Sequence, residues 1–325
     1  MTDEKGYVLR AADFGDGQCR ALAEDDAIAA LGHHQGLIWL HVTVEDRDAG
    51  RQLLQNRLGF HPLEVEDALS PYERPTLRAE EDTIFLVTPA VVLGQETERF
   101  VDAAFFVNKT FLVSVTVEPL GTLEHWFDQC LVKPRATGHS PALLLHSLVD
   151  AVVDGYFPAV DLLGDQIDAL EEAIFAGKKV NIGEALALKR RLLEMRRQVT
   201  PIRDILNGLL RRDQIFVDED ARVYFQDVYD HTLRITEVID MERDILSSVL
   251  DAHLSITSNN LNQVMRSMTV ISTLLMTAAF VAGVYGMNFK VMPELEWAYG
   301  YPFAYGLMGV LCAGELWIFR RVGWI

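Results

Sequence analysis

An uncharged amide lies between two apolar runs near the end of the chain, and two carboxylates follow it. The stretch VYGMNFKVMPELEW contains Gly286, Met287 and Asn288, followed a few residues later by Glu294 and Glu296. An amide oxygen accepts hydrogen bonds from the water around a hydrated cation, and nearby carboxylates raise the local cation concentration. These residue types at this spacing indicate a site that handles hydrated cations.

A stripe of polar, small and methionine residues runs through the apolar segment before this triplet. From Asn262 to Gly283 its members follow one another by 3, 3, 4, 4, 3 and 4 residues. That spacing averages 3.5, which is the period of helices that supercoil around a common axis. A packing seam between membrane helices would show the same pattern, so periodicity alone leaves seam and pore open. The candidate pore-lining residues are Asp251, Asn262, Met265, Met268, Ser272, Met276, Ala279 and Gly283.

Two segments are long and apolar enough to cross a membrane. Residues 264–285 approach the roughly 20 residues that a span needs, and residues 301–320 form a second apolar run. Arg266 lies at the start of the first run, and arginines end the second, so the positive-inside rule places both chain ends in the cytoplasm. The sequence therefore predicts a two-span protein of the plasma (inner) membrane, with the loop 286–300 outside.

One acid lies within the second span. Glu315 is about one helical turn from the cytosolic end of that segment. We expect its side chain to extend to the cytosolic interface, and a proton-linked role is the alternative.

The residues before the spans divide into two parts. Residues 1–135 alternate strand-like and helical segments, which predicts an α/β domain; the expected strands are 36–44, 83–93, 101–108 and 110–117. Residues 136–263 repeat apolar residues at helical spacing, with a kink expected at Pro158. No Gly or Pro occurs from residue 219 to residue 282. We therefore expect one long stalk helix that continues into the first span of the transmembrane hairpin, 264–325.

Composition excludes several classes of function. The net charge of −18 argues against nucleic acid as a partner, because nothing would neutralise its phosphates. The three cysteines lack metal-ligand spacing, which is typical of reduced cytosolic thiols. No nucleophile–base arrangement, phosphate loop or HExxH motif is present, so an enzyme is a poor interpretation. The following histidines show no metal spacing either, and most are expected to be surface or hydrogen-bonded structural residues: His33, His34, His61, His125, His139, His146, His231 and His253.

A collinear set of motifs resembles the CorA family of divalent-cation channels. YGMNF is followed by MPEL and by GYP at the opening of the second span, and earlier motifs lie in the expected order: FHPLEVEDAL (60–69), Arg74-Pro75, SLVDAVVDGYF (147–157), DVYDHT (227–232) and NQVMRSMTVIST (262–273). The resemblance covers nearly the whole chain. It implies a homopentameric funnel in the membrane, an α+β membrane protein that passes Mg2+, and often Co2+ or Ni2+, without ATP.

The resemblance also assigns roles to residues of the hairpin. Gly286, Met287 and Asn288 would form the selectivity filter, where a ring of amide oxygens holds a hydrated ion without trapping it. The stripe methionines would form hydrophobic constrictions. The chain departs from the family pattern at Thr277 and Ala279, where the pattern has Pro and Thr respectively, and these departures bear on ion selectivity.

The same resemblance implies a regulatory Mg2+ site between cytosolic domains. Asp67 would face Asp227 of a neighbouring subunit, with Glu66 and Asp150 close by. Taken alone, each is an acid on a helical segment, for which a solvated helix face is the default interpretation; the motif matches favour the regulatory site instead. Bound Mg2+ would hold a closed funnel, and its loss would let the subunits separate, which is feedback by the transported ion.

Two rival functions remain. A Zn2+ transporter resembling the ZntB branch, with possible proton linkage, shares the fold and a Gly-x-Asn loop. A membrane-anchored metal sensor that conducts nothing is the second. The stripe carries no Cys or His, the ligands that a zinc site recruits, which favours Mg2+.

Overall fold

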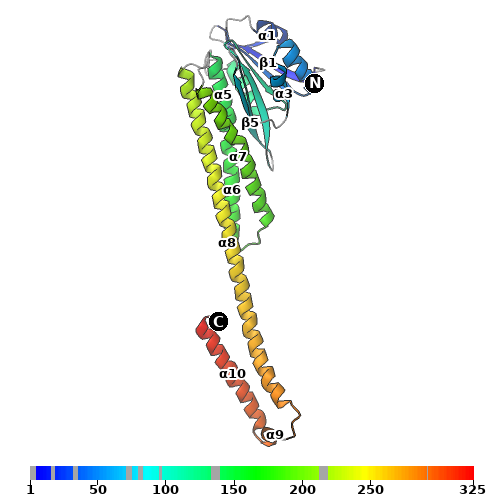
Figure 1. Cartoon of the computed structure of the whole chain (residues 1–325), viewed down its shortest axis with the longest axis vertical. Helices are drawn as coiled ribbons and strands as arrows, with labels where there is room; N and C mark the ends of the chain where they lie inside the picture. Colours follow the sequence, from blue (N-terminus) through cyan, green and yellow to red (C-terminus); the bar gives the residue numbers. More distant parts are fainter. Residues whose placement is uncertain are drawn as a thin grey trace. The chain divides into compact units, whose positions relative to one another are not determined.

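A computed structural model describes most of the chain (Figure 1). Its contacts divide the chain into two units, Met1–Ser247 and Ser248–Ile325, and each unit is described by itself. The described residues are 5–15, 19–31, 36–70, 75–79, 83–94, 97–132, 140–211, 219–290 and 292–325. His33, His34, Arg74 and His139 lie outside them.

The first unit contains a seven-stranded sheet in the order β2-β1-β3-β7-β6-β5-β4. Strands β3 and β7 pair in parallel, and all other neighbours are antiparallel. The strands are β1 (Tyr7–Asp13), β2 (Arg20–Leu22), β3 (Ile38–Val44), β4 (Thr76–Ala79), β5 (Ile84–Leu93), β6 (Glu98–Val107) and β7 (Phe111–Thr116). The four strands predicted from the sequence are β3, β5, β6 and β7, which form the centre of the sheet.

Helices cover both faces of this sheet. Every residue of β3 is buried. On one face Leu40 and Val42 join a core with Val65 and Leu69 of helix α3, and on the other face the ring of Trp39 packs against Phe127 of α4. Helices of the first face are α1 (Glu24–Ala30), α2 (Arg47–Arg51), the π-helical turn η2 (Gln52–Arg57) and α3 (Pro62–Leu69). The second face carries α4 (Gly121–Val132) and α5 (Pro141–Asp154).

Long helices complete the first unit. They are α6 (Tyr156–Phe175), α7 (Ile182–Arg211) and the part of α8 (Glu219–Tyr285) that precedes residue 248. Figure 1 shows this part of α8 beside α6 and α7, and Arg196 of α7 makes an ion pair with Asp240 of α8 at 3.2 Å. The interruption expected at Pro158 lies at Gly155 instead, between α5 and α6. Pro158 occupies the first turn of α6, where its missing N–H costs no helical hydrogen bond.

The second unit is a helical hairpin. The remainder of α8 is followed by α9 (Pro293–Glu296) and α10 (Gly300–Val322). The N–H of Gly286 donates to the carbonyl of Ala282 at 2.9 Å and ends α8. A Cβ at Gly286 would lie 3.2 Å from that same carbonyl oxygen. Close approach to the preceding turn therefore favours glycine at this position.

Among the residues that the structure describes, three helical stretches are apolar and long enough to span a membrane: Pro141–Phe175, Ala221–Tyr285 and Gly300–Val322. Half of the most apolar part of the first stretch is buried inside its own unit, whereas the corresponding parts of the other two are only 11% and 6% buried. The first stretch therefore owes its apolar character to core packing. The other two leave apolar side chains uncovered, as segments in lipid do.

Candidate metal cluster and membrane hairpin

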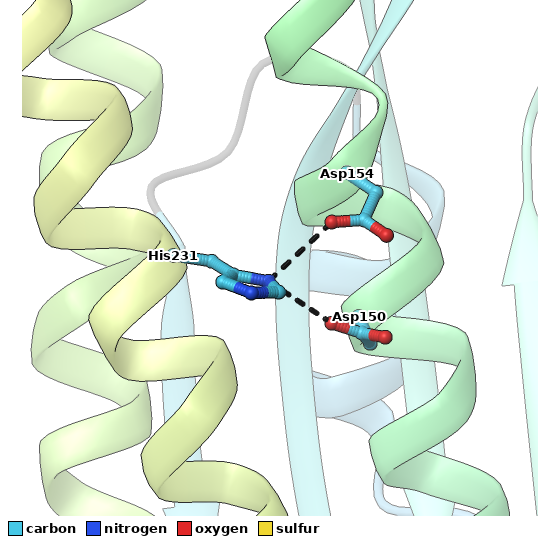
Figure 2. A group of neighbouring side chains, drawn as sticks. All are labelled: Asp150, Asp154 and His231. Atoms are coloured by element: carbon cyan, nitrogen blue, oxygen red, sulfur yellow. Dashed lines mark ion pairs between the residues drawn. The ribbon is translucent and has the colours of Figure 1, made fainter.

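Two carboxylates and an imidazole meet between helices α5 and α8 of the first unit. Figure 2 shows Asp150 and Asp154 projecting from one helix toward the ring of His231 on the other. The Nδ1 atom of His231 lies 3.5 Å from Oδ1 of Asp150 and 3.4 Å from Oδ1 of Asp154. One ligand atom from each residue lies within 4.8 Å of the other two. We call these three residues the cytosolic cluster.

Helical spacing on both elements produces this arrangement. Asp150 and Asp154 are four residues apart on α5, so both carboxylates lie on one face of the helix. Asp227 and His231 are likewise four apart on α8, and Oδ2 of Asp227 lies 3.9 Å from Nε2 of His231. The ring of His231 packs edge-to-face with the ring of Phe157, with 5.9 Å between their centroids, which limits the orientations of the imidazole.

The carboxylates of the cytosolic cluster are held under unfavourable electrostatic conditions. Burial raises the pKa of Asp150, an effect that His231 partly offsets. Burial also raises the pKa of Asp154, and the neighbouring Asp150 carboxylate raises it further. Neither Oδ1 of Asp150 nor Nδ1 of His231 makes a hydrogen bond to any described residue. A bound cation would satisfy these atoms and offset the repulsion between the two acids.

The ligand set defines which cations fit. Two ligand atoms that each lie about 2.1 Å from one ion are separated by roughly 3 to 3.5 Å. The two nitrogen–oxygen separations of 3.4 Å and 3.5 Å agree with this range, and all three ligand atoms lie within 4.8 Å of one another. Carboxylate oxygens suit Mg2+, whereas an imidazole nitrogen suits Co2+, Ni2+ and Zn2+. The residues of the cytosolic cluster therefore fit a divalent ion, with preference for a transition metal if His231 ligates directly.

Two of the four acids predicted for regulation lie at this place. Asp150 belongs to the cytosolic cluster, and Asp227 lies beside His231. Glu66 and Asp67 lie on α3, which packs on the opposite face of the sheet from α5. Asp67 makes an ion pair with Arg78 at 2.5 Å. Within one chain, α3 thus contributes no ligand to the cytosolic cluster.

Spacing along the sequence does not identify any histidine as a metal ligand, but His231 lies in a group of side chains that could hold a metal ion. The helical spacing is visible in the sequence: Asp154 follows Asp150 by four residues, and His231 follows Asp227 by four residues. The two residues of each pair lie on one helix face. When two such helix faces meet, the four side chains are close enough to ligate one ion. What the sequence lacks is the information that α5 and α8 face each other at this level.

The membrane part of α8 has two different faces. Residues that turn toward α10 are buried or half-buried, as in Val270, Leu274, Thr277 and Val281. The residues of the stripe from Asn262 to Gly283 are all exposed in the single chain. At about 100° per residue, the centre of the stripe lies about 180° from the centre of the covered face. The stripe is therefore not the seam between the two helices of one hairpin.

The side chain of Glu315 contacts the other helix of the hairpin. Its Oε1 accepts a hydrogen bond from the hydroxyl of Thr277 on α8, at 2.5 Å. The contact directs the carboxyl toward the other helix of the hairpin, which differs from the expected extension to the cytosolic interface.

The loop after α8 exposes the residues of the Gly-Met-Asn triplet. Met287 is 50% exposed, and Asn288 is exposed and lies outside any helix or strand. Glu296 lies exposed at the end of α9, and the Glu294 side chain lies outside the described part of the structure. An exposed amide at the tip of a hairpin can meet an ion that approaches from solution.

These features together are those of a membrane transporter for cations: an α/β unit, a long helix that ends in an apolar hairpin, and an amide-bearing loop. The family model for "CorA-like Mg2+ transporter protein" matches residues 34–321. The chain therefore belongs to this family, whose members are ion transporters and not enzymes.

Individual relatives agree with this assignment. The cobalt/magnesium transport protein CorA of Thermotoga maritima is 32% identical over 296 residues, which cover 88% of this chain and 83% of that protein. The protein of the same name from Methanocaldococcus jannaschii is 25% identical over 294 residues, which cover 89% of this chain and 92% of that protein. The solved structure of the M. jannaschii CorA magnesium transporter matches 98% of this chain and 99% of its own, with a TM-score of 0.85 at 22% identity. The expected fold of the single chain is confirmed: an N-terminal α/β domain, a long helix and a C-terminal apolar hairpin.

Proposed function

We propose that this chain is one subunit of a homopentameric channel that carries Mg2+, and also Co2+ or Ni2+, into the cytoplasm. The membrane potential supplies the driving force, since moving a divalent ion inward gains roughly 4.6 kcal/mol at 100 mV. The protein would lie in the plasma (inner) membrane with both ends of the chain cytoplasmic. Its parts would be a cytosolic α/β domain (1–135), a helical stalk (136–263) and the transmembrane hairpin (264–325).

One observation supports this proposal most strongly: the stripe lies on the face of α8 opposite to α10. A single hairpin cannot shield Asn262 and Ser272 from lipid, because α10 covers the other side. Several copies that turn their stripes toward one axis would shield them, and the 3.5-residue period suits helices around such an axis. The number five comes from the family resemblance.

The chemistry of this path favours hard, hydrated cations. A ring of Asn288 amide oxygens would accept hydrogen bonds from the water shell of Mg2+, which gives up its water reluctantly. Glu294 and Glu296 would concentrate cations near the entrance. Further along, rings of Met265, Met268 and Met276 would form hydrophobic constrictions that gate by dewetting.

The cytosolic acids would sense the transported ion. Within a chain, the carboxylates of Asp150 and Asp154 repel each other, and a cation near His231 would offset this repulsion. Between chains, Asp67 would exchange its Arg78 partner for an ion shared with a neighbour's Asp227. An ion shared between chains would stabilise the state with subunits together, and this differential binding would couple ion concentration to closure.

Substitution of Asn288 tests the proposed filter. We expect Asn288→Ala to abolish divalent-cation uptake into proteoliposomes while the oligomer still assembles, because the methyl group leaves no acceptor for the water shell. Phe289→Leu is the matched control, since it changes the exposed side chain on the other side of Asn288 and lies outside the proposed filter. Uptake by Asn288→Ala at the rate of the unsubstituted protein would exclude the amide filter.

A further inference from the structure

A side-chain hydrogen bond joins the two membrane helices of the hairpin. The hydroxyl of Thr277 on α8 donates to Oε1 of Glu315 on α10 at 2.5 Å. About one turn away on α10, the thiol of Cys312 approaches the carbonyl oxygen of Leu274 at 3.9 Å. The second carboxyl oxygen of Glu315, Oε2, is buried and makes no hydrogen bond to a described residue.

Thr277 differs in this respect from two other threonines of the same helix. The hydroxyls of Thr269 and Thr273 donate to the carbonyls of Met265 and Thr269, four residues earlier on their own helix. Such bonds stay within α8 and say nothing about its neighbour. The hydroxyl of Thr277 is directed outward to α10 instead.

The neighbouring residues on this face of α8 are apolar. Val270 and Val281 are 7% and 4% exposed, and Leu274 and Ala278 are half-buried. Apolar packing in lipid has little directional preference, whereas a hydrogen bond requires a particular distance and angle. The Thr277–Glu315 bond is therefore the contact that can define how α8 is rotated about its own axis.

The rotation of α8 decides where the stripe points. Met276 precedes Thr277 directly and projects about 100° around the helix from it, and it is 70% exposed in the single chain. If Thr277 is fixed toward α10, Met276 is fixed away from α10. A small rotation of α8 would move Met276 from that direction.

We propose that Thr277 and Glu315 are positioning residues for the ion path: their hydrogen bond fixes the rotation of α8 and so holds Met276 toward the axis of the channel. This inference rests on the proposed function, because it requires that the stripe lines a pore. Neither residue touches the ion. Glu315 acts as a hydrogen-bond acceptor here, so its role needs no transfer of a proton.

Cysteine accessibility tests the proposal in the full-length protein. The parental protein for this test has its three native cysteines replaced by alanine and carries Met276→Cys, and its oligomer is reconstituted in Mg2+-free liposomes. The rate of reaction with a water-soluble methanethiosulfonate reagent then reports whether position 276 faces the aqueous path. Thr277→Val removes the bond to Glu315, and Thr273→Val is the matched control because it removes only a bond within α8.

We expect Thr277→Val to slow the reaction of the thiol at position 276 by about three- to tenfold, the range that corresponds to the loss of one interhelical hydrogen bond in a membrane. Thr273→Val should leave the rate unchanged. Glu315→Leu should reproduce the effect of Thr277→Val. Glu315→Gln keeps an acceptor oxygen and Thr277→Ser keeps the hydroxyl, so both should retain the parental rate.

The outcomes separate this inference from the proposed function. A parental protein whose thiol at position 276 does not react overturns both the pore assignment and the positioning role. A reactive parental protein whose rate is the same with Thr277→Val and Thr273→Val overturns the positioning role alone. Loss of reactivity in Glu315→Gln would also overturn it, because that result requires an ionisable group rather than an acceptor.

Discussion

The carboxylates of the cytosolic cluster oppose folding when no cation is bound. Because burial raises the pKa of Asp150, the folded protein binds its proton more tightly than the unfolded chain does. The bound proton stabilises the folded protein fully at a pH below the pKa that Asp150 has in the unfolded chain. This stabilisation is lost as the pH rises through the higher pKa that Asp150 has in the folded protein. At pH 7 the carboxylate is therefore a source of strain that a cation would relieve.

Asp150→Asn should accordingly stabilise the metal-free protein. We expect its thermal unfolding midpoint in chelator at pH 7 to exceed that of the unsubstituted protein, and the difference should shrink as the pH falls through the folded pKa of Asp150. Circular dichroism of the detergent-solubilised protein measures both. Asp165→Asn, an exposed acid on α6, should show no such gain. A lower midpoint for Asp150→Asn at pH 7 would contradict the account.

Individual residues are predictable from the sequence to different degrees. Asp150 and Asp227 belong to motifs that resemble a family, and both lie beside His231. Asp154 and His231 lie in the same two motifs but receive no role from the sequence, since ligand spacing on one helix becomes informative only when the facing helix is known. The expectation for Glu315 is wrong for a similar reason: its partner Thr277 is 38 residues away in the chain. Contacts between elements, rather than residue types, are the missing information.

Among the elements, α8 is the one on which the proposed function most depends. Its length follows from the absence of Gly and Pro, and its stripe follows from spacing, but spacing alone does not distinguish a seam from a pore. The covered face opposite the stripe supplies that distinction.

The central strands are predictable because burial on both faces requires continuous apolar residues. Strands β1, β2 and β4 are not, since they are short or mix exposed and buried residues.

Ala279 provides a test at the scale of this helix. We expect Ala279→Thr to raise the ratio of Mg2+ to Co2+ uptake several-fold, because a ring of hydroxyls adds hydrogen bonds to the water shell of the harder ion. Ala278→Thr is the matched control: Ala278 is half-buried on the side toward α10, and its hydroxyl would not meet the ion. Equal ratios in the two variants would show that this face does not contact the ion path.

At the scale of the whole molecule, cytosolic ion binding would be coupled to the association of subunits. We expect millimolar Mg2+ to protect the cytosolic part of the unsubstituted oligomer from protease, because the bound ion holds neighbouring acids together. Asp227→Ala should lose this protection. Asp230→Ala, an exposed acid about one turn further along α8, should keep it. Mg2+-dependent protection that is identical in Asp227→Ala and the unsubstituted protein would contradict the regulatory role.

Ion flux through the purified oligomer tests the central claim most directly. Proteoliposomes loaded with a metal-sensitive dye are given Mg2+, Co2+ or Zn2+, with and without an inside-negative potential and with and without a pH difference. We expect Mg2+ uptake that rises with the potential and does not depend on the pH difference, with Zn2+ a weaker substrate, because the path offers oxygen ligands and no Cys or His. Mg2+ uptake no greater than in protein-free vesicles, or Zn2+ uptake that exceeds it and stops when the pH difference is removed, would contradict the account.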